Sequence, residues 1–215
     1  MKEFALYLPY ILPVLSFFFG AVPYAYLISR FFYGVNILEH GSGNPGASNV
    51  YRVVGKVPGI VVFFLDTLKG AVPVYIASLV VEGNYTVYYQ TLIGFCAAAG
   101  HIWTPYLNFH GGKGVATFLG TFLVIFPGGI LVSIGVGCVV ILISRIFSLG
   151  SLSGAGILPV TYFVFYWKDP WNSGTLPILF FCVATCILIF YRHRDNLQRL
   201  KQGKEFKTQL KSQEK

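Results

Sequence analysis

The 215-residue sequence predicts an all-α, polytopic membrane protein: a bundle of about seven transmembrane helices with its N-terminus outside and its C-terminus in the cytoplasm. Composition is the first reason, because 55% of the residues are hydrophobic and only 11% are charged, whereas soluble proteins carry about 25% charged residues. A domain of this size cannot hide so much apolar surface from water. The second reason is a series of long apolar runs, and the third is the placement of basic residues between them.

The apolar runs have the lengths of membrane-crossing helices, which need about 20 mostly apolar residues. In chain order, the candidate spans are residues 4–30, 54–81, 86–103, 114–127, 129–146, 152–167 and 174–191. The fourth and sixth runs are short, so five or six spans are the alternatives to seven. Several runs contain proline, which a bundle tolerates because neighbouring helices satisfy the backbone groups that proline frees.

Basic residues are concentrated in alternate connections between the predicted spans. If the N-terminus lies outside, the inner segments are residues 30–56, 104–113, 145–151 and 192–215, and they hold thirteen of the sixteen Lys and Arg residues. Such an excess marks the cytoplasmic side of a membrane protein. The glycine-rich motifs and the histidine motif described below all fall in these inner segments, so we expect them to meet at one membrane face.

The chain divides into a transmembrane catalytic bundle, residues 1–191, and a basic cytoplasmic tail, residues 192–215. The tail holds eight basic and three acidic residues, and attraction to anionic lipid explains most of this charge. Nucleic acid is not an expected partner, because no aromatic interleaving or known binding module accompanies the charge. We expect the first part of the tail, residues 192–200, to contribute to the site.

The first polar motif is His40–Asn49, followed by Arg52. Glycines let backbone N–H groups converge on an anion, and the side chains of Ser42 and Asn44 add donors. The guanidinium of Arg52 can fork onto a phosphate. We favour a phosphate cradle over a plain turn between two spans, which also uses Gly, Asn and Pro.

The second motif is Gly111-Gly112-Lys113-Gly114, at the start of the fourth span. A glycine-rich loop that opens a helix offers free N–H groups, the helix dipole and here a lysine charge to an anion. It is not the nucleotide-binding P-loop, because Gly114 stands where that motif needs Ser or Thr. The alternative is a flexible hinge whose lysine snorkels to the interface.

Asp66 and Lys69 are the ionisable pair of the second span. They lie three residues apart on one helix face, at a depth where ionisable groups are costly and tend to pair or act. We expect a structural ion pair; direct contact with a substrate is the alternative.

Two further motifs flank the last spans. Ser148-Leu149-Gly150-Ser151 follows Arg145, and by itself this is a turn with a topology-setting arginine.

The last motif follows Arg192. If the helix continues beyond Arg192, His193 and Asn196 lie on one face of it, and Arg199 is the next residue along that face. Histidine exchanges protons near neutral pH, and Asn and Arg can hold a phosphorylated substrate. These residues are therefore candidates for a functional site. The alternative is that His193 is only a hydrogen-bonded polar residue at the membrane interface.

Together the motifs describe anion sites on the cytoplasmic face of a bundle, without a metal-ligand pattern or a nucleophile-elbow motif. Such a face suits a reaction that joins a phosphorylated polar substrate to a lipidic one. A transporter for a small phosphorylated anion is the alternative, although it would need polar groups on the outer half for a second gate. A non-catalytic lipid-binding subunit would explain the basic tail but not the motifs together.

These stretches, in this order, resemble the bacterial membrane acyltransferases that transfer an acyl group from acyl phosphate to glycerol 3-phosphate. The matching stretches are Gly41–Arg52, Leu65–Gly70, Gly100-His101, Phe109–Thr117, Ser148–Ser151 and Arg192–Leu200 with Gly203 and Glu205. They cover nearly the whole chain and are specific only in combination. Two positions depart from the family pattern: Ser48 replaces the usual Thr, and Pro105 is displaced by one residue.

The resemblance implies a seven-span enzyme in the bacterial cytoplasmic (inner) membrane whose products are 1-acyl-glycerol 3-phosphate (lysophosphatidate) and phosphate, an early step of phospholipid synthesis. It implies acyl phosphate, glycerol 3-phosphate and membrane lipid as partners, and neither cofactor, metal nor acyl carrier; we expect a monomer. The resemblance assigns catalytic positions to His193, Lys113 and Ser151. It assigns substrate binding to Ser42, Asn44, Arg52, Gly111, Gly112, Gly114 and Asn196.

The chemistry of acyl phosphate is consistent with these roles. It is a mixed anhydride with a good leaving group, so the protein needs to supply positioning and charge neutralisation rather than a covalent intermediate. We expect the loop with Lys113 to hold the acyl-phosphate phosphoryl group, and Arg52, Ser42 and Asn196 to hold glycerol phosphate. The base is His193 or a substrate phosphate. Aromatic stretches such as Phe17–Phe19 or Phe180-Phe181 are candidates for the acyl groove.

Overall fold

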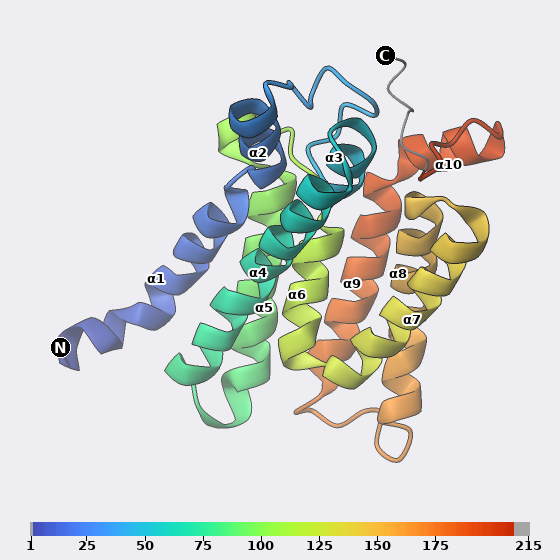
Figure 1. Ribbon diagram of the computed structural model, residues 1–215. Coiled ribbons are helices and arrows are strands. Elements are labelled where there is room, and N and C mark those ends of the chain that lie inside the picture. Colours follow the sequence, from blue (N-terminus) through green and yellow to red (C-terminus); the bar gives the residue numbers. More distant parts are fainter. Residues whose placement is uncertain (1, 209–215) are drawn as a thin grey trace.

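The computed structural model describes residues 2–208, and every regular element within that range is a helix (Figure 1). The helices are α1 (Lys2–Ala21), α2 (Tyr24–Tyr33), α3 (Ala47–Val53), α4 (Lys56–Val80), α5 (Thr86–Ile102), α6 (Val115–Ile125), α7 (Pro127–Ser144), α8 (Phe147–Phe165), α9 (Leu176–Arg192) and α10 (Arg194–Lys201). Two short 3-10 turns, η1 (Gly83–Tyr85) and η2 (Pro105–Leu107), lie before α5 and after it.

Each predicted span coincides with a helix, and the first is divided into α1 and α2 at Val22-Pro23, since proline lacks the N–H that would continue the helix. Four helical stretches are long and apolar enough to cross a membrane: Tyr7–Tyr33, Lys56–Val80, Pro127–Ser144 and Phe147–Phe165. A fifth is added if the bent pair α9–α10 is one span. The all-α membrane architecture is therefore confirmed, while the count of seven and the orientation of the termini stay predictions.

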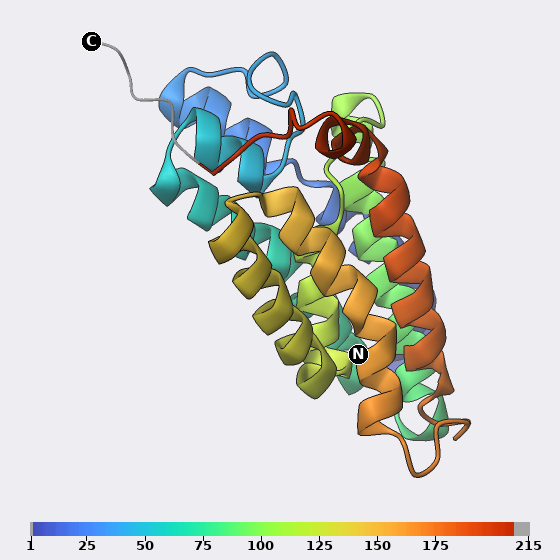
Figure 2. The same cartoon turned by 90° about the vertical axis from the view of Figure 1, so that its right-hand side faces the viewer.

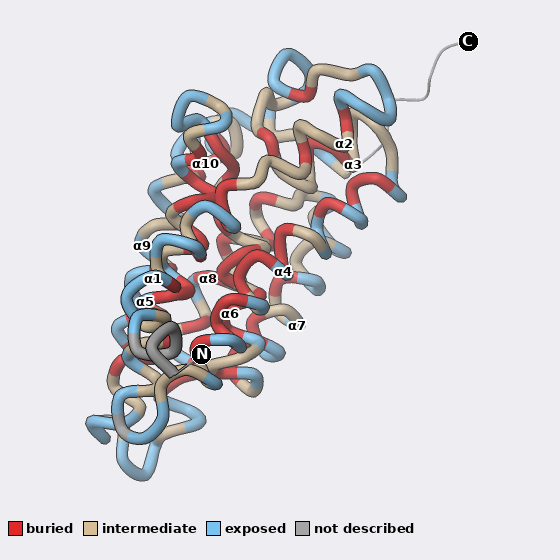
Figure 3. The backbone as a smooth tube through the Cα atoms, turned by 90° about the vertical axis from the view of Figure 1, so that its left-hand side faces the viewer, coloured by how far each residue is buried: buried red, intermediate tan, exposed pale blue. Residues whose placement is uncertain are grey.

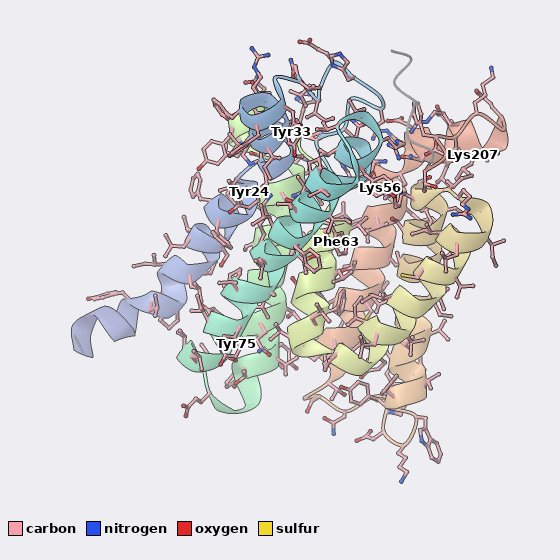
Figure 4. The ribbon with its side chains drawn as sticks, viewed as in Figure 1. Tyr24, Tyr33, Lys56, Phe63, Tyr75 and Lys207 are labelled. Carbon is pink, nitrogen blue, oxygen red and sulfur yellow. The ribbon has the colours of Figure 1, made fainter. Side chains whose placement is uncertain are left out.

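The chain runs back and forth between two ends of the bundle. Figure 4 labels Lys56 and Tyr75 near opposite ends of α4. The loop before α3, the junction of α7 and α8, and α10 lie together at the upper end in Figure 1. The polar motifs predicted to share a membrane face therefore share one end of the molecule.

Close packing between α4 and α6 forms the centre of the bundle. A Cβ added to Gly70 would overlap the backbone carbonyl of Thr117, and one added to Gly120 would overlap that of Thr67. Glycine at both positions lets the two backbones approach, as small residues do where membrane helices pack. The resulting contact fixes the N-terminal end of α6, which directly follows the loop that carries Lys113.

Buried positions line the inward faces of the helices, and exposed positions lie outward and at the ends (Figure 3). The largest buried cluster joins α5, α6, α7, α8 and α9, with aromatic residues such as Phe118, Phe122 and Tyr162 among its members. Large apolar side chains nevertheless point outward, among them Leu79, Ile143 and Phe180. An outward apolar surface of this kind is what a lipid environment requires.

Candidate active site

A cavity of about 380 Å³ lies between the helices and reaches the end where the motifs gather. Its lining changes character along its length. The polar part includes Ser42, Asn44, Arg52, Lys113, Gly114, Ser151, His193, Asn196 and Glu205. The apolar part is formed by α4, α6, α7, α8 and α9, with Phe63, Phe118, Phe122, Ile134 and Leu158 among its residues. One space therefore joins a cationic end to an apolar interior.

Asn49 holds the first motif in shape from the buried side of α3. Its Oδ1 accepts a 2.9 Å bond from the N–H of Ser42, and its Nδ2 donates to the carbonyls of Ile37 and His40 at 3.2 and 3.0 Å. Gly41 and Gly43 adopt positive φ angles of 62° and 67°, which only glycine does without strain. The loop thereby brings Ser42 to the cavity beside α3.

Arg52 extends from α3 to the cavity with donors to spare. Its Nε is buried and has no hydrogen-bond partner among the described residues. Burial lowers the pKa of its guanidinium from the ordinary value, although Glu205 acts in the opposite direction. A buried donor nitrogen without a partner is costly, and a guanidinium can fork onto a phosphate, so the site fits a phosphate-bearing ligand.

The loop before α6 departs from the expectation for Gly111 and Gly112. Their N–H groups donate to the carbonyls of Ile102 and His101 at 3.0 and 3.1 Å, and neither residue lines the cavity. The prediction that their N–H groups are free for an anion was therefore wrong: these donors satisfy the carbonyls that the end of α5 leaves open. The N-terminal turn of α6, which follows Gly114, keeps its own N–H groups for an anion.

Lys113 reaches across the cavity from this loop. Its Nζ donates to the Oδ1 of Asn196. Burial lowers its pKa from 10.5 to about 8, with Glu205 opposing and Arg199 and Arg52 adding to the effect. The ammonium therefore lies among other cations in a partly desolvated place, which favours binding of a negative ligand.

The residues of the tail are bound together by Glu205, which lies beyond the segment predicted to contribute. Its side chain is 3% exposed, and it accepts bonds from Asn196 at 2.6 Å, Ser148 at 2.9 Å and Arg199 at 2.8 Å. The ring of Phe206 contacts the guanidinium of Arg52 at 5.3 Å. Figure 2 shows the segment after α10 crossing the top of the bundle toward α3.

His193 stands at the corner between α9 and α10, where the axes bend by 59°. The expected continuous helix is therefore broken at this residue. Its Nδ1 lies 2.8 Å from the carbonyl of Ile189; a carbonyl only accepts, so Nδ1 carries the proton and Nε2 keeps a lone pair. Burial and the neighbouring Lys113 lower its pKa from 6.5 to about 3, so the imidazole is neutral at physiological pH.

Ser151 lies on α8, and its hydroxyl donates to the carbonyl of Phe147 at 3.0 Å. Asp66 and Lys69 pair at 2.7 Å and are almost completely buried. Asp66 also borders the cavity, whereas Lys69 does not. The ion pair lies beneath the loop that carries Lys113.

Eight of the ten predicted catalytic and binding residues thus line one cavity, and Gly111 and Gly112 do not. Sequence reasoning matched Glu205 to the family pattern without giving it a role in the site, and it missed Phe206. The available signal was a carboxylate and an aromatic residue within a strongly basic tail. The charge of this tail, taken alone, is explained by attraction to anionic lipid.

The apolar half corrects the candidates for an acyl groove. Neither Phe17–Phe19 nor Phe180-Phe181 lines the cavity. Phe180 is 66% exposed and points away from the bundle, whereas Phe63 of α4, labelled in Figure 4, lines the cavity. Sequence alone offers no means to choose among 20 phenylalanines, because the choice depends on how the helices turn in the bundle.

Known proteins share both the sequence and this architecture. The family described as glycerol-3-phosphate acyltransferase matches residues 10–203. Curated glycerol-3-phosphate acyltransferases from Endomicrobium trichonymphae and Wolinella succinogenes are 35% and 38% identical, covering 92% and 89% of this chain and 94% and 92% of the relatives.

Two crystal structures of PlsY, an integral membrane glycerol 3-phosphate acyltransferase, are similar to this fold. They represent its glycerol 3-phosphate form and its lysophosphatidic acid form, with TM-scores of 0.81 and 0.78. Each is 33% identical in sequence and covers 93% of this chain and 94% of the other. The chain therefore belongs to the glycerol-3-phosphate acyltransferase family of integral, multi-pass membrane proteins.

Proposed function

We propose that the chain transfers an acyl group from acyl phosphate to the primary hydroxyl of glycerol 3-phosphate, and releases lysophosphatidate and phosphate. The observation that carries this proposal is the single cavity whose cationic end continues into an apolar interior. Acyl phosphate needs both environments, and glycerol 3-phosphate needs only the first. The glycerol 3-phosphate and lysophosphatidic acid forms of the similar PlsY structures support the acceptor and the product.

Two groups of residues bind the two substrate phosphates, one group for each phosphate. Lys113 and the N-terminal turn of α6 hold the phosphoryl group of acyl phosphate, because a helix N-terminus and a lysine both favour an anion. Arg52, with Ser42 and Asn44 beside it, holds the phosphate of glycerol 3-phosphate. Asn196 contacts Lys113 and lines the same cavity as Arg52.

The transfer itself is a direct displacement at the acyl carbon. The primary hydroxyl oxygen forms a bond to the carbonyl carbon, the bond from that carbon to the phosphate oxygen breaks, and phosphate leaves with the electron pair. The hydroxyl proton passes to the Nε2 of His193 or to an oxygen of a substrate phosphate. Positioning of two reactants in one site supplies a large part of such a rate enhancement.

The proposal extends to the cell. The site faces the cytoplasm from the cytoplasmic membrane, since the segments at the site's end of the bundle hold most of the basic residues. Glycerol 3-phosphate is water-soluble and reaches this face directly, whereas acyl phosphate enters from the lipid. The product, one acyl chain on glycerol phosphate, returns to the lipid as a precursor of phospholipids.

Purified chain in detergent, supplied with palmitoyl phosphate and glycerol 3-phosphate, tests the proposal by phosphate release. We expect one phosphate for each lysophosphatidate formed, and no release above background without glycerol 3-phosphate. Lys113→Met provides the inactive control. Absence of turnover, together with movement of glycerol 3-phosphate into sealed vesicles that contain the chain, would contradict the proposal and favour a transporter.

A further inference from the structure

The loop that carries Lys113 rests on a buried charged cluster, of which Asp66 and His101 border the cavity and Lys69 does not. The cluster consists of Asp66 and Lys69 of α4 and His101 of α5, which are 2%, 1% and 7% exposed. The Lys69 Nζ lies 2.7 Å from the Asp66 Oδ1 and 3.3 Å from the His101 Nδ1. The ring of Tyr24, labelled in Figure 4, covers the same ammonium at 4.8 Å. Burying these charged groups carries a desolvation cost, and buried ionisable groups in a membrane protein often have a functional role.

The hydrogen-bond pattern fixes the orientation of the imidazole in this cluster. An ammonium group only donates, so the Nδ1 of His101 accepts from Lys69 and the proton lies on Nε2. The Nε2 edge then faces Gly112: a Cβ added to Gly112 would overlap the His101 Nε2. The ion pair thus fixes the orientation of the His101 ring, and the ring determines how closely Gly112 can approach α5.

Other bonds close the loop from two directions. The N–H groups of Gly111 and Gly112 donate to the carbonyls of Ile102 and His101. The Nη2 of Arg192 donates to the carbonyls of Gly111 and Gly112 at 3.3 and 3.2 Å. The backbone immediately before Lys113 is therefore held through both its N–H and its carbonyl groups, and Gly112 packs directly against the ring of His101.

We propose that Asp66, Lys69 and His101 act as positioning residues for the phosphate-binding loop, so that Lys113 and the N-terminal turn of α6 are held ready for the phosphoryl group. The inference rests on the proposed function for the identity of that substrate. It goes beyond an ion pair that only stabilises the bundle, since its effect is on the affinity of one substrate.

His101→Asn tests the proposal without leaving an unpaired charge. The asparagine keeps a polar group near the Nδ1 position for Lys69 but removes the part of the imidazole ring that packs against Gly112. We expect the KM for palmitoyl phosphate and the dissociation constant for inorganic phosphate to rise about tenfold, the equivalent of one charged hydrogen bond, with little change in the KM for glycerol 3-phosphate. Unchanged affinities with a lower yield of active protein would overturn the proposal, because that is the signature of a purely structural role.

Gly112→Ala provides an independent arm through a double-mutant cycle. The added methyl overlaps the imidazole in the wild type, but finds room once His101 is Asn. We expect the double variant to be no worse than the worse single variant. Multiplied losses would show two independent sites and would overturn the proposed contact.

Tyr162→Phe is the matched control, because Tyr162 is also buried and its hydroxyl bonds to the carbonyl of Pro170 at 2.9 Å, in the loop at the other end of the bundle. This variant should lower the midpoint of thermal unfolding and leave both KM values unchanged. If the wild type turns over no palmitoyl phosphate, the proposed function fails. Binding of inorganic phosphate to His101→Asn then still decides the positioning role.

Discussion

Burial sets the charge states of Lys113 and His193, two ionisable residues that line the cavity. Desolvation lowers the pKa of Lys113 to about 8 and that of His193 to about 3. Lys113 is therefore mostly protonated at neutral pH and loses its charge as the pH rises above 8, whereas His193 is neutral throughout the range in which most enzymes are assayed. Under the proposed function, Lys113 and Arg52 attract the phosphates, and His193 contributes the lone pair of Nε2.

The pH profile follows from the charge of Lys113. We expect kcat/KM for palmitoyl phosphate to fall as the pH rises through about 8, since this parameter reports the free enzyme. Lys113→Arg should move that alkaline limb upward, because arginine stays protonated. In the wild type the limb of kcat should lie at a higher pH, since a bound phosphate stabilises the ammonium. An alkaline limb that is the same in both proteins would exclude Lys113 as its source.

Glu205 offers a second prediction for a single residue. Glu205→Gln removes the charge that holds Asn196, Ser148 and Arg199 together, and each lost bond to a charged group is worth about 1.5–3 kcal/mol. We expect kcat/KM to fall about 10- to 100-fold. The neighbouring Lys204 is exposed, so Lys204→Gln should keep wild-type kinetics. Equal behaviour of the two variants would show that the carboxylate does not organise the site.

At the scale of elements, the sequence predicts helices better than the contacts between them. Apolar runs locate the helices because lipid demands satisfied backbone groups, and α1 and α2 fall within a single predicted span. The bend at His193 and the use of the Gly111 and Gly112 N–H groups were not foreseen. Both depend on which carbonyls at the ends of α5 and α9 lack partners, and that is decided by packing.

The approach of α4 to α6 gives a testable consequence at this scale. Gly120→Ala places a methyl against the carbonyl of Thr67, and overpacking of this kind costs about 1–3 kcal/mol. We expect a lower midpoint of thermal unfolding in detergent. Gly135→Ala, at a position in α7 with open space around it, is the control and should not lower the midpoint, because alanine favours a helix over glycine. Equal midpoints would mean that the two helices separate without cost.

At the scale of the whole molecule, the distribution of basic residues predicted that distant motifs share one end, and the fold brings Arg52, Lys113 and His193 to one cavity there. Their convergence was predictable because positive charge marks one membrane face. The contribution of Glu205 was not, because a basic tail attracted to lipid requires no particular fold. The apolar part of the cavity was not predictable either, since it depends on the rotation of each helix about its axis.

The proposed reaction requires both substrates to occupy this cavity together and to react directly. A matrix of initial rates with palmitoyl phosphate and glycerol 3-phosphate each varied tests this requirement. We expect lines that intersect in the double-reciprocal plot, as a ternary complex requires. Parallel lines, with release of phosphate from palmitoyl phosphate before glycerol 3-phosphate is added, would indicate an acylated protein intermediate and rule out direct transfer.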